Sequence, residues 1–172
     1  MWAPHPRPSP QGERGEQPSE LIPLPQAPRP EGRGEPRATG GCLCGAVRYE
    51  VRGGLRPVVA CHCTQCRRMT GHFLAATAAR EGDLAITRGS TLKWYSASAH
   101  ARRGFCGDCG STLFWHGTDR DYVAIAAGSI DGATGLKLVQ HIYTADKGDY
   151  YELDDGIPQS AQGLPPICRD WS

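Results

Sequence analysis

From about Ala38 onward, apolar and polar residues alternate in short runs separated by glycine and other turn-forming residues. Runs of this kind occupy 46–51, 56–63, 72–79, 83–87 and 91–98, and they return at 111–117, 121–130 and 136–143. Alternation over such short runs is typical of half-buried β-strands. No stretch keeps a helical period over several turns, although 64–69 is compatible with a single helical turn. The pattern predicts a mainly β domain of short strands.

The first 37 residues differ from the rest in composition. They hold ten of the fourteen prolines, with five arginines balanced by five glutamates and one thin apolar patch, LIPLP. Such a segment cannot bury enough apolar surface to offset the entropy lost when the chain is ordered. We therefore predict a disordered proline-rich tail over residues 1–37. The alternative is a partner motif in PLPQAPRP that adopts a polyproline helix.

Length and charge limit the classes of protein that need to be considered. At 172 residues with a net charge of +1, the chain fits one ordinary domain and carries no block of like charge. It therefore shows no electrostatic signal for nucleic acid or an anionic membrane. No apolar run approaches the ~18–20 residues of a membrane helix, and the N-terminal segment lacks the apolar centre of a secretory signal. We expect a cytoplasmic protein without a nucleic-acid or membrane partner.

The eight cysteines carry most of the chemical information. They stand at positions 42, 44, 61, 63, 66, 106, 109 and 168, as one C-x-C pair, one C-x-C-x-x-C cluster, one C-x-x-C pair and a lone C-terminal residue. A disulfide scaffold is the alternative that an even count allows. Such scaffolds belong to secreted chains, and cysteines two positions apart are poor disulfide partners for each other. The clustering therefore favours metal binding.

Two of these clusters together supply four thiolates. GGCLCG contributes Cys42 and Cys44, and FCGDCG contributes Cys106 and Cys109. Four thiolates around one ion make the closed tetrahedron that is typical of structural zinc. Such a site would join the start of the domain to a late hairpin and contribute to folding. The alternative is a set of four buried free cysteines.

The segment CHCTQCRRMTGH contains the remaining cluster, Cys61, Cys63 and Cys66. On an extended chain Cys61 and Cys63 project to one face, and a turn that starts near Thr64 brings Cys66 back toward them. Three protein ligands and one open position are how zinc is held for catalysis rather than for support. A soft three-thiolate centre suits a sulfur ligand. Thiol addition to a small electrophile such as an aldehyde is therefore the predicted reaction class.

Four motifs occur in the order GGCLCGAVRYEV, ACHCTQCRRMTG, RGFCGDCGSTLFW and HIYTADKGDYYELDDGIPQ. Together they resemble the GFA family, the glutathione-dependent formaldehyde-activating enzymes and their relatives, which include centromere protein V. The resemblance covers about residues 38–162 and leaves 163–172 as a C-terminal extension. It implies a single domain with the zinc-containing β-tent fold of short antiparallel strands.

The same resemblance implies a function and a metal content. Structural zinc would be held by Cys42, Cys44, Cys106 and Cys109, and labile catalytic zinc by Cys61, Cys63 and Cys66. We therefore expect two zinc ions per chain, the second site being partly empty. The founding activity of the family is a carbon–sulfur lyase that joins glutathione and formaldehyde reversibly to S-(hydroxymethyl)glutathione. The implied substrates are a small glutathione-like thiol and formaldehyde or another small aldehyde.

Several alternatives stay open on the sequence alone. Cys168, His62 or His72 could complete a closed second metal site, and His72 stands where the family more usually has a small residue. The aromatic residues Trp94, Trp115 and Tyr143 could line a pocket, but aromatic residues on strands usually belong to a core.

A non-catalytic zinc-binding interaction module is the alternative function. A β-class methionine sulfoxide reductase would need a reactive cysteine apart from its metal, and only Cys168 is spare.

Overall fold

The structure, a computed structural model, describes residues 35–165, and the strands of this part form two sheets. The smaller sheet has the strand order β1-β2-β5, and the larger has the order β11-β10-β3-β4-β9-β8-β7-β6. The strands of the smaller sheet are β1 (Ala38–Gly41), β2 (Arg48–Val51) and β5 (Leu84–Arg88). Those of the larger sheet are β3 (Val58–Cys61), β4 (Leu74–Arg80), β6 (Leu92–Ser98), β7 (Ala101–Cys106), β8 (Thr112–Gly117), β9 (Tyr122–Ala126), β10 (Leu138–Ile142) and β11 (Gln159–Ser160).

Helical structure in residues 35–165 is short. The α-helix α1 covers Thr64–Thr70, and three 3₁₀ turns cover Glu81–Asp83 (η1), Ala127–Ser129 (η2) and Thr144–Asp146 (η3). The α1 helix ends at Gly71, whose left-handed φ of 79° lets its N–H reach the carbonyl of Arg67. The helical turn predicted over 64–69 is therefore present and is one residue longer.

The prediction of a mainly β domain of short strands is confirmed. The alternating runs identified in the sequence correspond to eight of the strands, whereas β1, β7 and β11 were not predicted. The β1 segment ATGG holds no large apolar residue, β11 has only two residues, and the β7 segment ARRGFC places a buried arginine where an apolar residue is expected. Most strand pairs are antiparallel, but β10 pairs in parallel with both β3 and β11.

The main hydrophobic core lies where the two sheets meet. Tyr49 and Val51 of β2 are buried while Arg48 and Glu50 are only half-buried, as the alternation of a strand requires. The ring of Tyr49 packs edge-on against Phe114 of β8, with centroids 5.2 Å apart. The other buried members of this core are Cys42, Val47, Ala79, Leu84, Cys106, Leu113, Val123 and Ile125.

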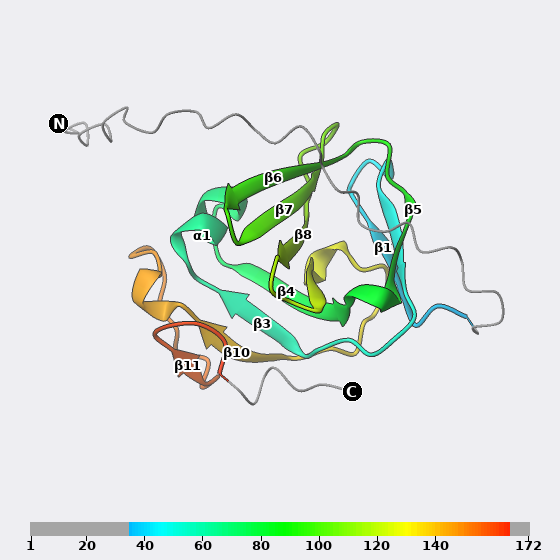
Figure 1. The fold of residues 1–172 in the computed structure, drawn as a ribbon. Coiled ribbons are helices and arrows are strands. Elements are labelled where there is room, and N and C mark those ends of the chain that lie inside the picture. Colours follow the sequence, from blue (N-terminus) through cyan, green and yellow to red (C-terminus); the bar gives the residue numbers. More distant parts are fainter. Residues whose placement is uncertain (1–34, 166–172) are drawn as a thin grey trace, which may run out of the picture.

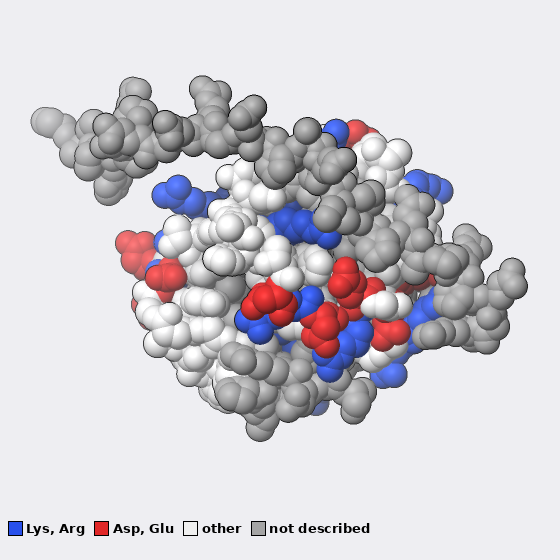
Figure 2. Space-filling view, viewed as in Figure 1, with Lys and Arg blue, Asp and Glu red and all other residues white. Residues whose placement is uncertain are grey.

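The larger sheet curves, so that β6, β7 and β8 lie across from β3 and β4 (Figure 1). Helix α1 stands at one end of this arrangement, and the smaller sheet stands at the other. On the face drawn in Figure 2, acidic and basic side chains are intermixed over the described part of the surface. Within residues 35–165, no helix is long and apolar enough to cross a membrane.

Two predictions fall largely or wholly outside the described residues. The predicted tail 1–37 overlaps residues 35–165 only at its last three positions, and Cys168 lies beyond them. The domain limits of 38–162 and 163–172 stay predictions, as does the absence of nucleic-acid and membrane partners.

Candidate metal centre and cavity

The four-cysteine set is assembled by two tight turns. Cys42 directly follows β1, and a turn closed by the Gly45 N–H on the Cys42 carbonyl brings Cys44 beside it. Cys106 ends β7, and the Gly110 N–H donates to its carbonyl in a second turn that carries Cys109. Gly45 and Gly110 have φ values of 76° and 74°, which other residues rarely adopt. The two turns face each other across 62 residues of sequence, with Cys44 Sγ 3.8 Å from Cys106 Sγ.

The spacing of these sulfur atoms fits one metal ion. All four Sγ atoms lie within 4.8 Å of one another, and Cys42 Sγ and Cys44 Sγ are 3.5 Å apart. A tetrahedral zinc with Zn–S bonds of ~2.3 Å separates its sulfurs by about 3.8 Å. Hydrogen bonds to the sulfurs, such as the one from the Val47 N–H to Cys42 Sγ at 3.2 Å, also favour the thiolate form that a metal needs. The structure thus brings together the residues predicted to hold structural zinc.

The three-cysteine set stands at the junction of β3 and α1. Cys61 is the last residue of β3, Cys63 is the N-cap of α1, and Cys66 lies in the first turn of that helix. The Cys66 N–H points at Cys63 Sγ, 3.5 Å away. The three Sγ atoms lie within 4.8 Å of one another, as predicted from the bend after Cys63. This donor set of three thiolates suits zinc, and the structure describes no fourth protein ligand in the cluster over residues 35–165.

The three thiols interact strongly with one another. Hydrogen bonds from the thiols of Cys61 and Cys66 lower the pKa of Cys63 to about 2. Hydrogen bonding with Cys63 raises the pKa of Cys61, and burial acts in the same direction. One thiolate is therefore favoured by its two neighbours even without a metal. A cation at the centre of the cluster would favour the thiolate form of all three.

The structure narrows the alternatives for a fourth ligand. Both ring nitrogens of His62 are used elsewhere, Nδ1 lying 2.5 Å from Tyr151 Oη and Nε2 lying 2.8 Å from His141 Nδ1. His72 stands just before β4 and packs against the ring of Tyr151, with centroids 4.3 Å apart. Neither histidine belongs to the three-cysteine cluster. Cys168 lies outside the described residues.

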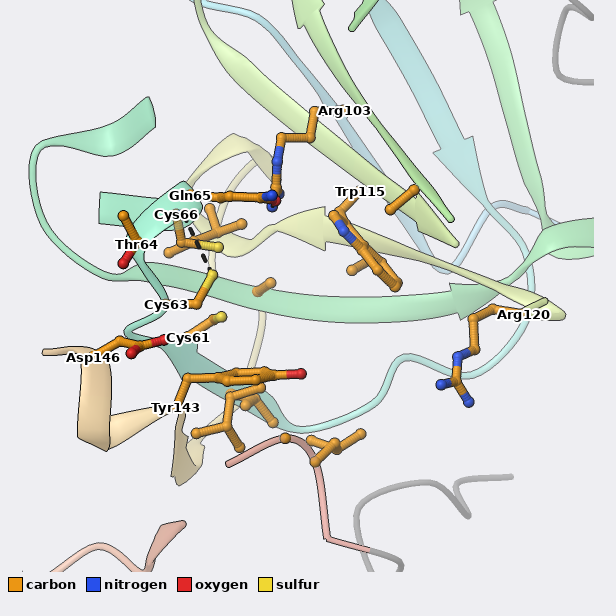
Figure 3. A pocket seen from close by; sticks show the side chains of 18 of the residues that line it. Cys61, Cys63, Thr64, Gln65, Cys66, Arg103, Trp115, Arg120, Tyr143 and Asp146 are labelled. Atoms are coloured by element: carbon orange, nitrogen blue, oxygen red, sulfur yellow. Dashed lines mark hydrogen bonds between the residues drawn. The ribbon is translucent and has the colours of Figure 1, made fainter. Parts of the chain in front are cut away.

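The three cysteines open onto a cavity of about 510 Å³. Its walls come largely from alternate residues of the strands, so that one face of the larger sheet lines it. Pairs of such residues are Leu74 and Ala76 of β4, Ala101 and Arg103 of β7, and Tyr122 and Ala124 of β9. Figure 3 shows the sulfurs of Cys61, Cys63 and Cys66 grouped on one wall, with the ring of Tyr143 beside Cys61. None of the four cysteines of the other set lines this cavity.

Comparison with known proteins identifies the family. The sequence model described as glutathione-dependent formaldehyde-activating enzyme, GFA, matches residues 37–146. The chain belongs to the GFA family. The matched segment contains both cysteine clusters and most of the strands that line the cavity. The resemblance drawn from the four sequence motifs is confirmed.

Two individual proteins that are similar to this chain can be described. A protein of Schizosaccharomyces pombe, named an uncharacterized lyase, is 26% identical over 120 residues, which covers 69% of this chain and 86% of that protein. A crystal structure of a Rhodobacter sphaeroides protein shares 29% sequence identity, covers 55% of this chain and 89% of its own, and superposes with a TM-score of 0.48. The lyase name belongs to the Schizosaccharomyces pombe protein, and the enzyme description belongs to the GFA family model.

The aromatic residues left open by the sequence divide between core and cavity in this GFA domain. Trp94 packs on Phe114 at the core, with ring centroids 6.0 Å apart, as expected for a strand aromatic. Trp115 and Tyr143 instead line the cavity. Tyr143 has a left-handed φ of 56°, which is uncommon for a residue other than glycine and is often found at functional sites. Burial raises the pKa of its hydroxyl, so Tyr143 is protonated at neutral pH.

Sequence reasoning missed the arginines of the GFA cavity. Arg56, Arg103 and Arg120 all line it, against one lining carboxylate, Asp146. Arg56 and Arg103 are 5% and 4% exposed, which is unusual for arginine. The available signal was a charged residue inside a strand segment, as in ARRGFC, but the sequence does not say which of the two arginines there faces inward.

Proposed function

We propose that this chain is a zinc-dependent carbon–sulfur lyase that catalyses the reversible addition of a thiol to formaldehyde or another small aldehyde. One observation carries the proposal: Cys61, Cys63 and Cys66 converge on the wall of a cavity large enough for a small substrate, whereas the four-cysteine set lies outside it. Membership of the GFA family and the lyase name of the Schizosaccharomyces pombe relative support the lyase class. A glutathione-like thiol is the proposed sulfur substrate.

The two cysteine sets have different proposed roles. Cys42, Cys44, Cys106 and Cys109 would hold a structural zinc, because four thiolates leave no position for a substrate. Cys61, Cys63 and Cys66, which line the cavity, would hold the catalytic zinc, because three thiolates leave one of the four ligand positions of zinc for a substrate. A zinc ion bound there would supply a soft Lewis-acid centre that favours the thiolate form of a substrate thiol.

The proposed reaction is balanced without any further reactant. In the addition direction, the substrate sulfur forms a bond to the aldehyde carbon, and the carbonyl π electrons move to the oxygen. The proton lost by the thiol ends on that oxygen, giving a hydroxyalkyl thioether. In the lyase direction the carbon–sulfur bond breaks, and the hydroxyl proton returns to sulfur.

The cavity walls supply the environment for this step. Leu74, Ala76 and Ala124 present apolar surface to the cavity, which limits the water available to hydrate the aldehyde. The ring of Tyr143 lies beside Cys61, so it bounds the space in which the reacting atoms meet (Figure 3). The chain thus holds the thiol and the aldehyde close together, which lowers the entropic part of the barrier.

The test combines metal analysis with an activity assay on the full chain. Zinc is quantified in the purified protein, and the disappearance of formaldehyde is followed by NMR with several thiols, glutathione included. We expect acceleration over the uncatalysed reaction, and we expect a mild chelator to remove zinc from the three-cysteine set first and the activity with it. Unfolded protein with equimolar free zinc is the control. If the zinc-loaded protein accelerates none of these reactions, the interaction-module alternative is favoured instead.

A further inference from the structure

Arg103 is a buried cation in the cavity wall. Arg103 is 4% exposed, and within residues 35–165 its side chain makes one hydrogen bond, from Nη2 to Gln65 Oε1 at 2.6 Å. The buried Nε has no hydrogen-bond partner. Within residues 35–165, no carboxylate lies within ion-pairing distance of its guanidinium. Arg103 is attracted to the thiolates of Cys63 and Cys66, whose pKa values it helps to lower, but these do not satisfy the N–H at Nε. Burying such a donor without an acceptor is unfavourable, so the site favours a ligand that accepts hydrogen bonds from the guanidinium.

The position of Arg103 relates it to the cysteine cluster. Its hydrogen-bond acceptor, Gln65, lies in α1 between Cys63 and Cys66. Its direct neighbour across the sheet is Trp115 of β8, which lines the same cavity. Figure 3 shows the guanidinium lying over Gln65 near the sulfurs, on the far side of the cavity from Tyr143. An anion bound by Arg103 would therefore belong to the molecule that occupies the cavity.

The other charged side chains that line the cavity also favour an anionic ligand. Arg56 and Arg120 also line it, and Asp146 is the lining carboxylate, so arginine exceeds carboxylate by three to one. Guanidinium is the group best suited to a carboxylate because its planar N–H fork matches the two oxygens. Phosphate would need more donors, whereas a carboxylate is satisfied by the N–H groups of a single arginine.

We propose that Arg103 is a specificity-determining residue that binds a carboxylate group of the substrate. This inference rests on the proposed function, since it assigns the binding of part of the substrate in the same cavity. The carboxylate belongs either to the thiol or to the aldehyde, and both sources share the chemistry that Arg103 recognises. The competing role is charge compensation, in which Arg103 balances the thiolates of the cluster and contacts no substrate.

The first experiment compares acid substrates with their uncharged amides in the full chain. One arm pairs formaldehyde with 3-mercaptopropionate or 3-mercaptopropionamide, and the other pairs 2-mercaptoethanol with glyoxylate or glyoxylamide. We expect Arg103→Gln to raise KM for the acid in one arm by about tenfold or more, as the loss of a charge-assisted hydrogen bond predicts. KM for the matching amide should stay within about twofold of the unmutated protein. The arm that responds identifies the molecule that carries the carboxylate.

The control variant is Arg102→Gln. Arg102 is the neighbouring residue of β7, but it does not line the cavity and lies over the ring of Trp94, 4.6 Å from its centroid. The ratio of acid to amide KM should not change in this variant. If Arg103→Gln affects acids and amides equally and also lowers zinc retention, Arg103 compensates the thiolate charge and the inference is wrong.

A second experiment measures binding without reaction. Calorimetry with 3-(methylthio)propionate or oxamate, which cannot form the carbon–sulfur bond, should give weaker binding of one of them to Arg103→Gln. If Arg103→Gln weakens binding of a probe but the unmutated protein accelerates no thiol addition, the carboxylate site is supported and the proposed function is wrong. If the protein is active but binds neither probe, or binds both probes equally well with and without Arg103→Gln, the inference about Arg103 is wrong and the proposed function is unaffected.

Discussion

His62 Nε2 lies 2.8 Å from Nδ1 of His141, and both side chains are buried, with exposures of 0% and 1%. The two histidines belong to a longer chain, in which His62 Nδ1 contacts Tyr151 Oη and His141 Nε2 contacts the carboxylate of Asp155 at 2.9 Å. Hydrogen bonds from the Ile157 N–H and from His141 lower the pKa of Asp155, so this carboxylate only accepts.

That carboxylate fixes Nε2 of His141 as a hydrogen-bond donor. The other ring nitrogen of His141, Nδ1, pairs with His62 Nε2, and His62 Nδ1 pairs with the hydroxyl of Tyr151. All four ring nitrogens of the two buried histidines therefore have a hydrogen-bond partner. The chain connects the segment that carries the three cysteines to the loop that follows η3.

The first prediction concerns this buried pair. The substitution His141→Leu leaves the buried His62 Nε2 and the Asp155 carboxylate without their hydrogen-bond partner, so the free energy of unfolding should fall by about 1–3 kcal/mol. Urea unfolding followed by circular dichroism measures the change. His100→Leu is the matched control, because His100 is exposed and only its backbone takes part in hydrogen bonds. Equal stability losses in the two variants would show that the buried chain contributes little.

The second prediction separates the two metal sites. Cys109→Ser removes one thiolate from a closed site whose binding energy is part of the folding energy, so the variant should be insoluble or unfold without cooperativity. Cys66→Ser should stay folded with about one zinc per chain, because the four-sulfur site is intact, and should lose activity toward thiol and formaldehyde. Zinc content, thermal unfolding and the NMR assay check both. If Cys66→Ser unfolds the domain as severely as Cys109→Ser, both sites are structural.

The third prediction concerns the contact between the smaller sheet and η2. A Cβ added to Gly40 of β1 would overlap the ring of Tyr49 and the backbone carbonyl of Ser129. The Tyr49 hydroxyl is hydrogen-bonded to Ser129 Oγ at 2.7 Å, so neither group can move freely. Gly40→Ala should therefore lower the free energy of unfolding by about 1–3 kcal/mol.

Gly128→Ala supplies the control for that substitution. Gly128 lies in η2 beside Ser129, but a Cβ added to Gly128 meets no heavy atom within 4 Å. The melting temperature of the Gly128→Ala variant should stay close to that of the unmutated protein. A melting temperature of Gly40→Ala that matches Gly128→Ala would contradict the steric argument.

The fourth prediction is a dependence of stability on pH at His116. Arg102 Nη2 donates to His116 Nδ1 at 3.2 Å, which requires the neutral imidazole. Burial lowers the pKa of His116, so the folded protein binds this proton more weakly than the unfolded chain does. The contribution to stability is present above the unfolded pKa of ~6.5 and is lost as pH falls below it.

His116→Asn keeps an acceptor for Arg102 but does not titrate in this range. Its free energy of unfolding should therefore fall less than that of the unmutated protein between about pH 7.5 and about pH 5. Urea unfolding across this interval measures both slopes. Parallel slopes would mean that His116 does not contribute to the acid sensitivity.

The cysteine sites were largely predictable because their geometry is local. The spacing of Cys61, Cys63 and Cys66 is enough to bring three sulfurs together, since a strand end and one helical turn fix their directions. The two pairs of the four-cysteine set are also local, each being held by one tight turn. Their union needed only the inference that four thiolates share one ion. The mainly β character followed from the same kind of local pattern.

The rest of the site depends on which strands become neighbours. His62 meets His141 only because β10 pairs in parallel with β3, across 79 residues of sequence, and no periodic pattern encodes that pairing. Arg103 faces the cavity rather than solvent because the register of β7 against β8 places it beside Trp115, and a shift of one residue would present Arg102 instead. Local spacing thus determined which residues can bind metal. Sheet order and register, which arise from packing of the whole chain, decided which charges and rings surround them.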